Sequence, residues 1–179
     1  NMATNDLTFN VGENKPAKTE ALAVFLNVGT KQAPDWAILG IRVTSSSAEM
    51  DWQKEEFTDI TGKVYASIKT PIINQTFDGW TINGGDRAQQ HVWNLGIRNQ
   101  DTASLQAQDV LRVHFYAGTE AKPFAERFDA STVLINSLGG DGGGNLNMPI
   151  SVTYGGTRSI GTATSTDSTV TFTPDSTGL

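Results

Sequence analysis

The sequence contains no cysteine, few charged residues and no long hydrophobic segment. Its 179 residues therefore form no disulfide, no thiolate site for zinc or an iron–sulfur cluster, and no thiol nucleophile. Only 13 Lys and Arg stand against 19 Asp and Glu, which argues against sequence-specific DNA or RNA recognition. The longest apolar-rich stretch, residues 21–28, is too short to cross a bilayer, so we expect no membrane insertion.

Hydroxyl residues and glycine are abundant instead. The chain has 22 Thr, 12 Ser and 18 Gly but only 8% aromatic residues, a composition typical of strands and turns. We expect a mainly-β domain, built as a two-sheet β-sandwich or half-barrel with one flanking α-helix at about residues 86–98.

The chain divides into three segments. Residues 1–18 are polar and are expected to form an N-terminal arm, in which Asn1 is interpreted as a cloning remnant before a start at Met2. Residues 19–155 form the β-sandwich with its helix. Residues 156–179 form a C-terminal arm or edge strand, since this Ser-, Thr- and Gly-rich segment cannot bury enough apolar area to fold alone.

Hydrophobic patterning predicts strands through most of the domain. Residues 22–28 and 36–43 are apolar enough to form buried strands. The clearest alternation is in residues 110–117, where apolar side chains share one face. This pattern predicts a half-buried antiparallel strand with Arg112 and His114 on the polar face.

One segment has the pattern of a helix. Asp86 precedes Gln89 by three residues, an arrangement in which the two side chains can cap a helix reciprocally. Ala88, Val92 and Leu95 then recur at helical spacing, which predicts an apolar stripe packed against a sheet edge.

The sequence shows no pattern for catalysis or metal binding. Neither histidine has a zinc-ligating partner at helical spacing. The glycine-rich residues 139–144 lack the Gly-Lys-Ser/Thr ending of a phosphate loop, and no Gly-x-Ser-x-Gly is present. We expect no enzyme activity, no catalytic residues, no cofactor and no metal.

An acidic segment and four tryptophans remain. The acids could supply a carboxylate pair for glycoside hydrolysis or oxygen ligands for Ca²⁺, but a solvated or contact face is the simpler interpretation. Trp36 and Trp93 lie in apolar settings and are expected in the core. Trp52 and Trp80 are flanked by acids or turn residues, and could stack on a sugar or on another subunit. The acids are Glu49, Asp51, Glu55, Glu56 and Asp59.

The order of these segments resembles a known family. The runs that carry the resemblance are 36–40, 44–47, 85–95, 137–150, 154–156, 161–162 and 171–174. In the order of these runs, from about residue 8 to residue 174, the sequence resembles the major tail (tail tube) proteins of long, non-contractile-tailed phages and prophages of Gram-positive bacteria, including tailocin relatives.

The resemblance implies a structural protein of the virion tail that assembles in the cytoplasm of the host bacterium. Six copies would join their inner sheets into a ring, and rings would stack into a hollow tube that conducts the double-stranded DNA genome without binding it specifically. Its implied partners are further copies of itself, a tape measure protein, a tail terminator and a distal tail protein. The acidic balance agrees, because a channel rich in Lys and Arg would hold phosphates.

We expect subunit or ring-stacking contacts from the acidic segment, the N-terminal arm and the segment after Gly155. The alternative is a carbohydrate-binding or adhesive β-sandwich domain of a phage or cell surface, with Trp52 or Trp80 as the stacking platform. The residues expected at subunit contacts are Glu49, Asp51, Trp52, Glu55, Glu56, Asp59, Val170 and Phe172.

Overall fold

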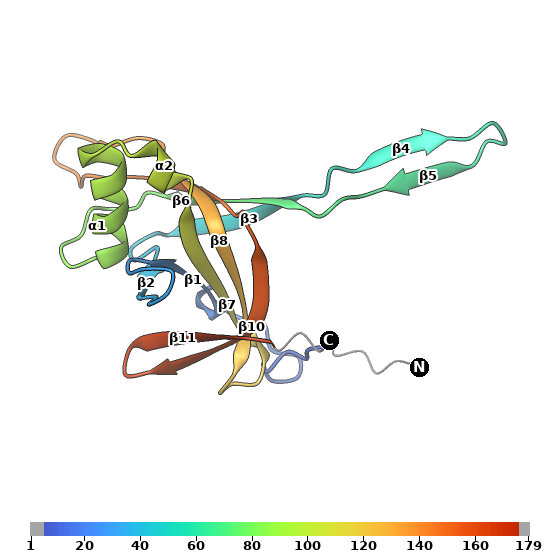
Figure 1. The fold of residues 1–179 in the computed structure, drawn as a ribbon, viewed down its shortest axis with the longest axis horizontal. Coiled ribbons are helices and arrows are strands. Elements are labelled where there is room, and N and C mark those ends of the chain that lie inside the picture. Colours follow the sequence, from blue (N-terminus) through green and yellow to red (C-terminus); the bar gives the residue numbers. More distant parts are fainter. Residues whose placement is uncertain (1–5, 176–179) are drawn as a thin grey trace.

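The computed structural model describes residues 6–175, and most of its strands belong to one curled antiparallel sheet (Figure 1). The strand order is β2-β1-β7-β8-β9-β6-β3, and the hairpin of β10 and β11 joins at β8. The predicted mainly-β half-barrel is confirmed, and its layers are parts of the same sheet. Asn1 and Met2 lie outside the described residues. The strands are β1 (Leu22–Asn27), β2 (Trp36–Leu39), β3 (Ser45–Asp51), β4 (Glu55–Thr58), β5 (Val64–Ser67), β6 (Ile72–Asp78), β7 (Gln108–Gly118), β8 (Pro123–Ile135), β9 (Ile150–Thr153), β10 (Arg158–Thr166) and β11 (Thr169–Pro174).

One helical segment packs on the sheet where the sequence predicts it. α1 (Arg87–Trp93) continues directly into a π-helical turn, η2 (Asn94–Arg98), so the segment reaches the predicted end. The π-turn lies close to β8, since a Cβ atom at Gly96 would be 2.4 Å from Cδ1 of Ile135. Within residues 6–175, no helix has the length and hydropathy needed to span a membrane. Two shorter helical turns are η1 (Thr19–Ala21) and α2 (Thr102–Leu105).

Of the predicted reciprocal cap of α1, the bond to the Asp86 side chain is confirmed, and the return bond from Gln89 is not formed. The Asp86 carboxylate accepts a hydrogen bond from the Gln89 backbone N–H at 3.1 Å. Gln89 does not return the bond to Asp86. Its Oε1 accepts from the backbone N–H of Asn83 at 2.9 Å, and its Nε2 donates to the carbonyl of Thr81 at 3.0 Å. The buried Gln89 side chain therefore fixes the loop that precedes the helix.

Apolar side chains pack on both faces of β7. Val110 belongs to a cluster shared with β1, β6, β9 and α1, whereas Leu111 belongs to a second cluster beneath the β10–β11 hairpin. The prediction of a half-buried strand is therefore wrong, and Arg112 on the polar face is only 3% exposed. The curl of the sheet and the addition of β10 at β8 cover this face.

Buried ion pairs make that covered polar face possible. The Glu126 carboxylate on β8 faces basic side chains from two other strands. Arg112 Nε lies 3.1 Å from Glu126 Oε1, but the geometry is not that of a hydrogen bond. His114 Nε2 lies 3.2 Å from the same oxygen, and Arg158 Nη2 donates to Oε2 at 2.7 Å. The Arg112 guanidinium also lies 5.1 Å from the centre of the Tyr154 ring. This ion cluster ties β7, β8 and β10 together.

The ion cluster predicts a loss of stability in acid. Burial alone would raise the pKa of Glu126, but hydrogen bonds from His114 and Arg158 and the charge of Arg112 outweigh it and lower the pKa to about 2, against an ordinary value of 4.5. Because the unfolded chain takes up the proton first, the stabilisation is complete above about pH 5 and is lost as the pH falls through 4.5 towards 2. We expect the urea midpoint to fall between about pH 5 and pH 3.

The control for this prediction is Glu126→Gln, in which the side chain keeps its shape but does not titrate. Hydrogen bonds also lower the pKa values of Asp35, Asp59 and Asp101, so part of the acid sensitivity comes from elsewhere. The urea midpoint of the Gln variant should therefore depend less steeply on pH than that of the wild-type protein. Parallel profiles for the two proteins would show that Glu126 does not carry the effect.

Candidate assembly surfaces

A long hairpin extends from the body of the molecule (Figure 1). The β3–β6 ladder forms its base and the β4–β5 ladder its tip. β9 pairs with β6 at Asn74–Phe77, and the Tyr154 backbone N–H donates to the carbonyl of Ile73, so within the described chain residues 50–72, here called the arm, form a two-stranded structure. The two ladders are interrupted at Gln53, where the backbone has a φ of +50°. Between the ladders, the Lys69 backbone N–H donates to the carbonyl of Trp52.

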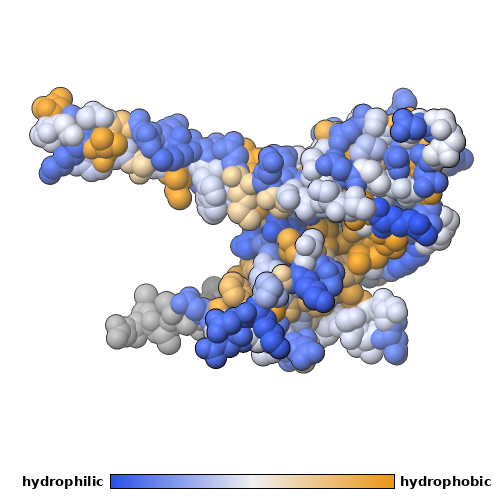
Figure 2. All heavy atoms as spheres, turned by 180° about the vertical axis from the view of Figure 1, so that it is seen from behind, coloured by the Kyte–Doolittle hydropathy of each residue, from blue (hydrophilic) through white to orange (hydrophobic). Residues whose placement is uncertain are grey.

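The arm exposes apolar side chains on both of its faces, and Figure 2 shows apolar residues along the side of the arm that faces the viewer. Phe57 and Tyr65 pair across the tip and stack with ring centroids 5.6 Å apart, and Ile60 is fully exposed in the turn. A two-stranded hairpin without a covering layer is marginal by itself. Exposed apolar patches of this kind mark interaction sites. The exposed apolar residues are Met50, Trp52, Phe57, Ile60, Val64, Tyr65, Ile68 and Ile72.

The structure brings most of the predicted contact residues together on the arm. Glu55 and Glu56 are neighbours on β4 and therefore point to opposite faces of the tip. This placement excludes that adjacent pair as the two carboxylates of a glycosidase. Glu56 instead forms an exposed ion pair with Lys54 at 2.5 Å. The predicted contact residues on the arm are Asp51, Trp52, Glu55, Glu56 and Asp59, with Glu49 at its base; their part in subunit contacts stays a prediction.

Asp59 shapes the turn at the tip of the arm. Its carboxylate accepts hydrogen bonds from the Thr61 hydroxyl at 2.6 Å and from the backbone N–H groups of Thr61 and Lys63 at 2.8 and 3.1 Å. These bonds, that of the Thr61 hydroxyl first, hold the pKa of Asp59 below its ordinary value. Asp followed by Thr and Gly is a turn signal in the sequence. The turn presents Ile60 to solvent.

Two of the four tryptophans lie where the sequence did not indicate. Trp36 is buried and Trp52 exposed, as predicted. Trp80 is 0% exposed in the larger core cluster, so it is excluded as the stacking platform that the sequence left open. Its carbonyl accepts from the Met148 backbone N–H at 2.8 Å, which brings a distant loop over it. Trp93, predicted in the core, is 36% exposed because it lies beside the apolar stripe of α1.

The predicted contact residues near the C-terminus face their own chain. β10 pairs with β8 and with β11, so residues 158–174 form a hairpin attached to the sheet. Val170 and Phe172 of β11 are partly buried against the second core cluster, close to Ala163. Their part in subunit contacts stays a prediction, but packing within the chain accounts for much of their apolar surface.

The outer face of β3, β6, β9 and β8 carries hydroxyl and acidic side chains. Residues paired directly across an antiparallel ladder share a face, and Ser47, Thr76 and Ser151 form one such row. In a second row, the Thr153 hydroxyl donates to Asn74 Oδ1 at 2.5 Å. The set has three acids and neither Lys nor Arg. This hydroxyl face comprises Ser45, Ser47, Glu49, Asp51, Ile72, Asn74, Thr76, Asp78, Thr132, Leu134, Ser151 and Thr153.

The strands that bear the hydroxyl face end in an unpaired strand edge on each side, within the described chain. β3 is the last strand of the sheet on one side. On the other side, β7 accompanies β8 only as far as Ser131, so Thr132–Ile135 pair with β9 alone while α2 packs nearby. Unpaired edges are templates for pairing with another chain.

Ligand chemistry is sparse on these surfaces. Within residues 6–175, no group of three or more His, Asp or Glu side chains is placed to hold a metal ion. His91 lies 3.0 Å from Gln108 Oε1, and His114 belongs to the ion cluster. The features that stand out are therefore the arm, the hydroxyl face and the two strand edges.

Solved structures with a similar fold include parts of contractile injection machines. The tube-terminating cap of the anti-feeding prophage aligns over 90% of this chain and 99% of its own, with 16% sequence identity and a TM-score of 0.52. The fold is tail-tube-related. The PVC sheath/tube terminator, from an extracellular contractile injection system in its extended state, aligns over 83% of this chain and 99% of its own, with 10% identity and a TM-score of 0.50.

At such low identity, the similarity establishes the tail-tube-related fold and not a shared activity. The PVC neighbour belongs to a contractile injection system, whereas the sequence resemblance concerns long non-contractile tails. No family model and no curated protein sequence matches the chain. The comparisons therefore show the fold and do not distinguish a contractile from a non-contractile particle.

Proposed function

We propose that this chain is a ring-forming structural subunit of a phage-type tail, either in the tube itself or in the ring that terminates it. The observation that carries the proposal is the hydroxyl face with an unpaired edge on each side. If β3 of one copy paired beside Thr132–Ile135 of the next, the four strands would continue from copy to copy. A head-to-tail contact of this kind generates a closed ring when the rotation between copies closes.

The chemistry of the hydroxyl face suits the wall of a channel. Three acids and six Ser or Thr side chains on this face, with no Lys or Arg, offer no cation to a passing phosphate backbone. The proposal follows the resembled family in placing six copies in the ring, with double-stranded DNA as the cargo and the virion tail as the location. The tape measure, distal tail and terminator proteins would then be its partners.

The similar solved structures add a second form of the same proposal. The anti-feeding prophage neighbour is a tube-terminating cap, and the alignment covers 99% of its length and 90% of this chain. A terminating ring would stay a single ring at high concentration, whereas a tube subunit would stack. The carbohydrate-binding alternative loses one of its two platforms, because Trp80 is buried.

Electron microscopy of the concentrated protein tests this proposal first. We expect rings or tubes about 100 Å wide, the size of six such domains around a channel. A double variant, Ser47→Lys with Thr76→Lys, then tests which face lines the channel. Its assemblies should retain short duplex DNA and protect it from nuclease at low salt, and should release it as salt rises.

The matched control carries two lysines on exposed residues of the helical region, Asn99→Lys with Gln106→Lys. These assemblies should protect no more DNA than the wild-type assemblies do. Equal protection by both variants would place the channel elsewhere. A wild-type protein that stays monomeric at every concentration, also when mixed with preformed tail ends, would contradict the proposed function.

A further inference from the structure

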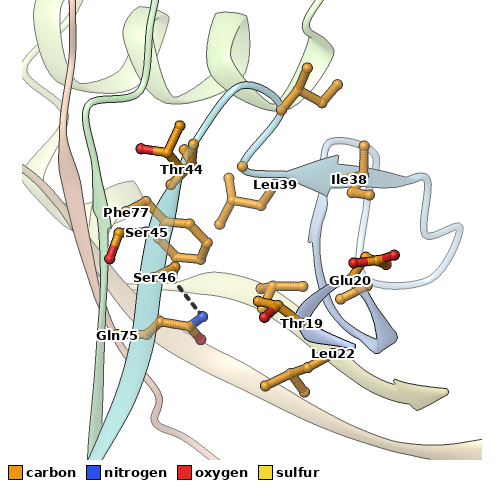
Figure 3. Close-up of a pocket in the computed structure, with 15 residues that line it drawn as sticks. Thr19, Glu20, Leu22, Ile38, Leu39, Thr44, Ser45, Ser46, Gln75 and Phe77 are labelled. Atoms are coloured by element: carbon orange, nitrogen blue, oxygen red, sulfur yellow. Dashed lines mark hydrogen bonds between the residues drawn. The ribbon is translucent and has the colours of Figure 1, made fainter. Parts of the chain in front are cut away.

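A groove of about 460 Å³ lies at the seam where the two ends of the curled sheet approach each other (Figure 3). One wall comes from β1 and β2, and the other from β3 and β6. β2 pairs only with Val24–Asn27 of β1, so the strand edge at Leu22 is left uncovered on this side within the described chain. The edge of β3 borders the opposite wall. We call this the seam groove.

The seam groove is apolar inside and polar at its rim. Leu22, Leu39 and Phe77 line its interior, and Figure 3 shows Leu39 and Phe77 side by side. Ile41, which also lines it, remains 39% exposed, whereas Ile38 pairs with Phe25 and presents its side chain on the opposite face of β2 from Leu39. At the rim, Gln75 donates a hydrogen bond to the Ser46 hydroxyl at 2.9 Å. An apolar groove beside the uncovered strand edge at Leu22 suits an extended segment with alternating apolar side chains.

The charges at the groove have both signs. Glu20 lies on its rim. Arg42 is exposed between Ile41 and Val43, both of which line the groove, and it makes no salt bridge within the described chain. A partner that carries one acid and one cation beside an apolar centre would match this arrangement.

The tip of the arm has this composition. Cross-strand pairing places Phe57, Tyr65 and Glu55 on one face of the tip. Lys63 directly precedes β5 and lies next to the turn. The tip therefore offers a stacked aromatic pair with an acid on one side and a cation on the other. Both of its strands also have unpaired outer edges within the described chain.

The arm cannot fill the groove of its own chain. Figure 1 shows the arm tip and β2 at opposite ends of the molecule. An arm that occupies the groove would therefore come from a second copy. Because donor and acceptor surfaces differ and lie at opposite ends, the contact is head-to-tail and recurs from copy to copy.

We propose that the arm tip of one copy docks in the seam groove of the next, with Phe57 and Tyr65 over Leu22 and Ile41. Glu55 then lies beside Arg42. This inference rests on the proposed function and names the acceptor surface that the arm requires. It also explains why the arm can expose so much apolar surface, since the assembled ring covers it.

Thiol crosslinking tests the contact cleanly because the chain has no cysteine of its own. The test variant carries Ser67→Cys on the Phe57 face of the tip and Thr44→Cys on the wall of the groove. A short bis-maleimide should join neighbouring copies into a ladder of covalent oligomers. Docking raises the local thiol concentration, so the rate should exceed that of a colliding pair by roughly 100-fold.

The matched control keeps Ser67→Cys and moves the acceptor to Gln90→Cys, on a second apolar groove beside α1 that Ile82, Trp93 and Leu146 line. It should react at the collision rate. Adding Phe57→Ala to the test variant should lower its rate towards the control. Preferred crosslinking to Gln90→Cys, or equal rates at both acceptors, would overturn the proposal.

Microscopy of the same samples distinguishes failure of the seam-groove contact from failure of the proposed function. Rings that form without preferred crosslinking at Thr44→Cys would refute the seam groove and leave the proposed function standing. Preferred crosslinking that produces only open chains would support the docking and contradict the closed ring. A monomeric protein with no preferred crosslinking would refute both.

Discussion

Replacing Glu126 by alanine is expected to lower the free energy of unfolding by about 3–5 kcal/mol, a large part of the stability of a domain of this size. The carboxylate is the common partner of Arg112, His114 and Arg158. Arg112 is 3% exposed, so without Glu126 its charge would stay buried and uncompensated. Urea titration at neutral pH, with circular dichroism to confirm the fold, measures the change.

The matched control is Arg158→Ala, which removes a different member of the same cluster. The Arg158 side chain is 48% exposed, so water replaces much of what the ion pair supplied. Its cost should be about 1 kcal/mol or less. If Arg158→Ala destabilised the protein as much as Glu126→Ala, the buried charge of Arg112 would not be the cause.

Replacing Trp80 by alanine is expected to cost about 3–5 kcal/mol, because it leaves a cavity in the larger core cluster. Trp80 is 0% exposed and packs among the apolar side chains shared by β6, β9 and α1. The Trp80→Ala variant should unfold at a much lower temperature than the wild-type protein. If its core no longer forms, the variant should show no cooperative thermal transition.

Trp52→Ala provides the contrast for that prediction. Trp52 is 46% exposed on the arm, away from both core clusters. The variant should unfold at the wild-type temperature as a monomer, and its effect should emerge only when copies associate. Similar losses of stability in Trp52→Ala and Trp80→Ala would contradict the different environments of the two residues.

The helix shows which signals can be read from sequence alone. Its capping residue Asp86 and two members of the predicted stripe, Ala88 and Val92, act within two turns of chain and lie as predicted, whereas the third member, Leu95, is only partly buried in the π-turn. Gln89 deviates because its partners, Asn83 and Thr81, lie in a loop whose path depends on the rest of the fold. Local patterns predicted the element, and distant packing decided its contacts.

The polar face of β7 shows what a single-strand pattern cannot contain. Arg112 and His114 alternate with apolar residues, which is also the pattern of a strand open to solvent. They are buried because β10, far along the chain, brings Arg158 to the shared carboxylate of Glu126. Arg112, Glu126 and Arg158 lie on three different strands, and only the order of these strands in the sheet shows that their charges meet.

The arm illustrates the opposite case. Val64 and Ile68 alternate with more polar residues, a pattern typical of a strand that packs against a core. Both are strongly exposed, because no layer of this chain lies behind β5. The sequence predicted the acidic residues as contacts from their inability to fold alone. It contained no signal that the same segment would project from the body, or that β3 and the end of β8 would be left as edges.

The interruption between the two ladders of the arm has a mechanical consequence. Bending where Gln53 leaves the extended conformation would distort neither the β3–β6 ladder nor the β4–β5 ladder. The interruption therefore separates two hydrogen-bonded segments, the root and the tip of the arm, which the bond from Lys69 to Trp52 alone connects across the strands. In the proposed ring assembly, such arms would bend first at residues 52–54 under lateral load, so the resistance of the assembly to bending would depend on these residues as well as on its rings.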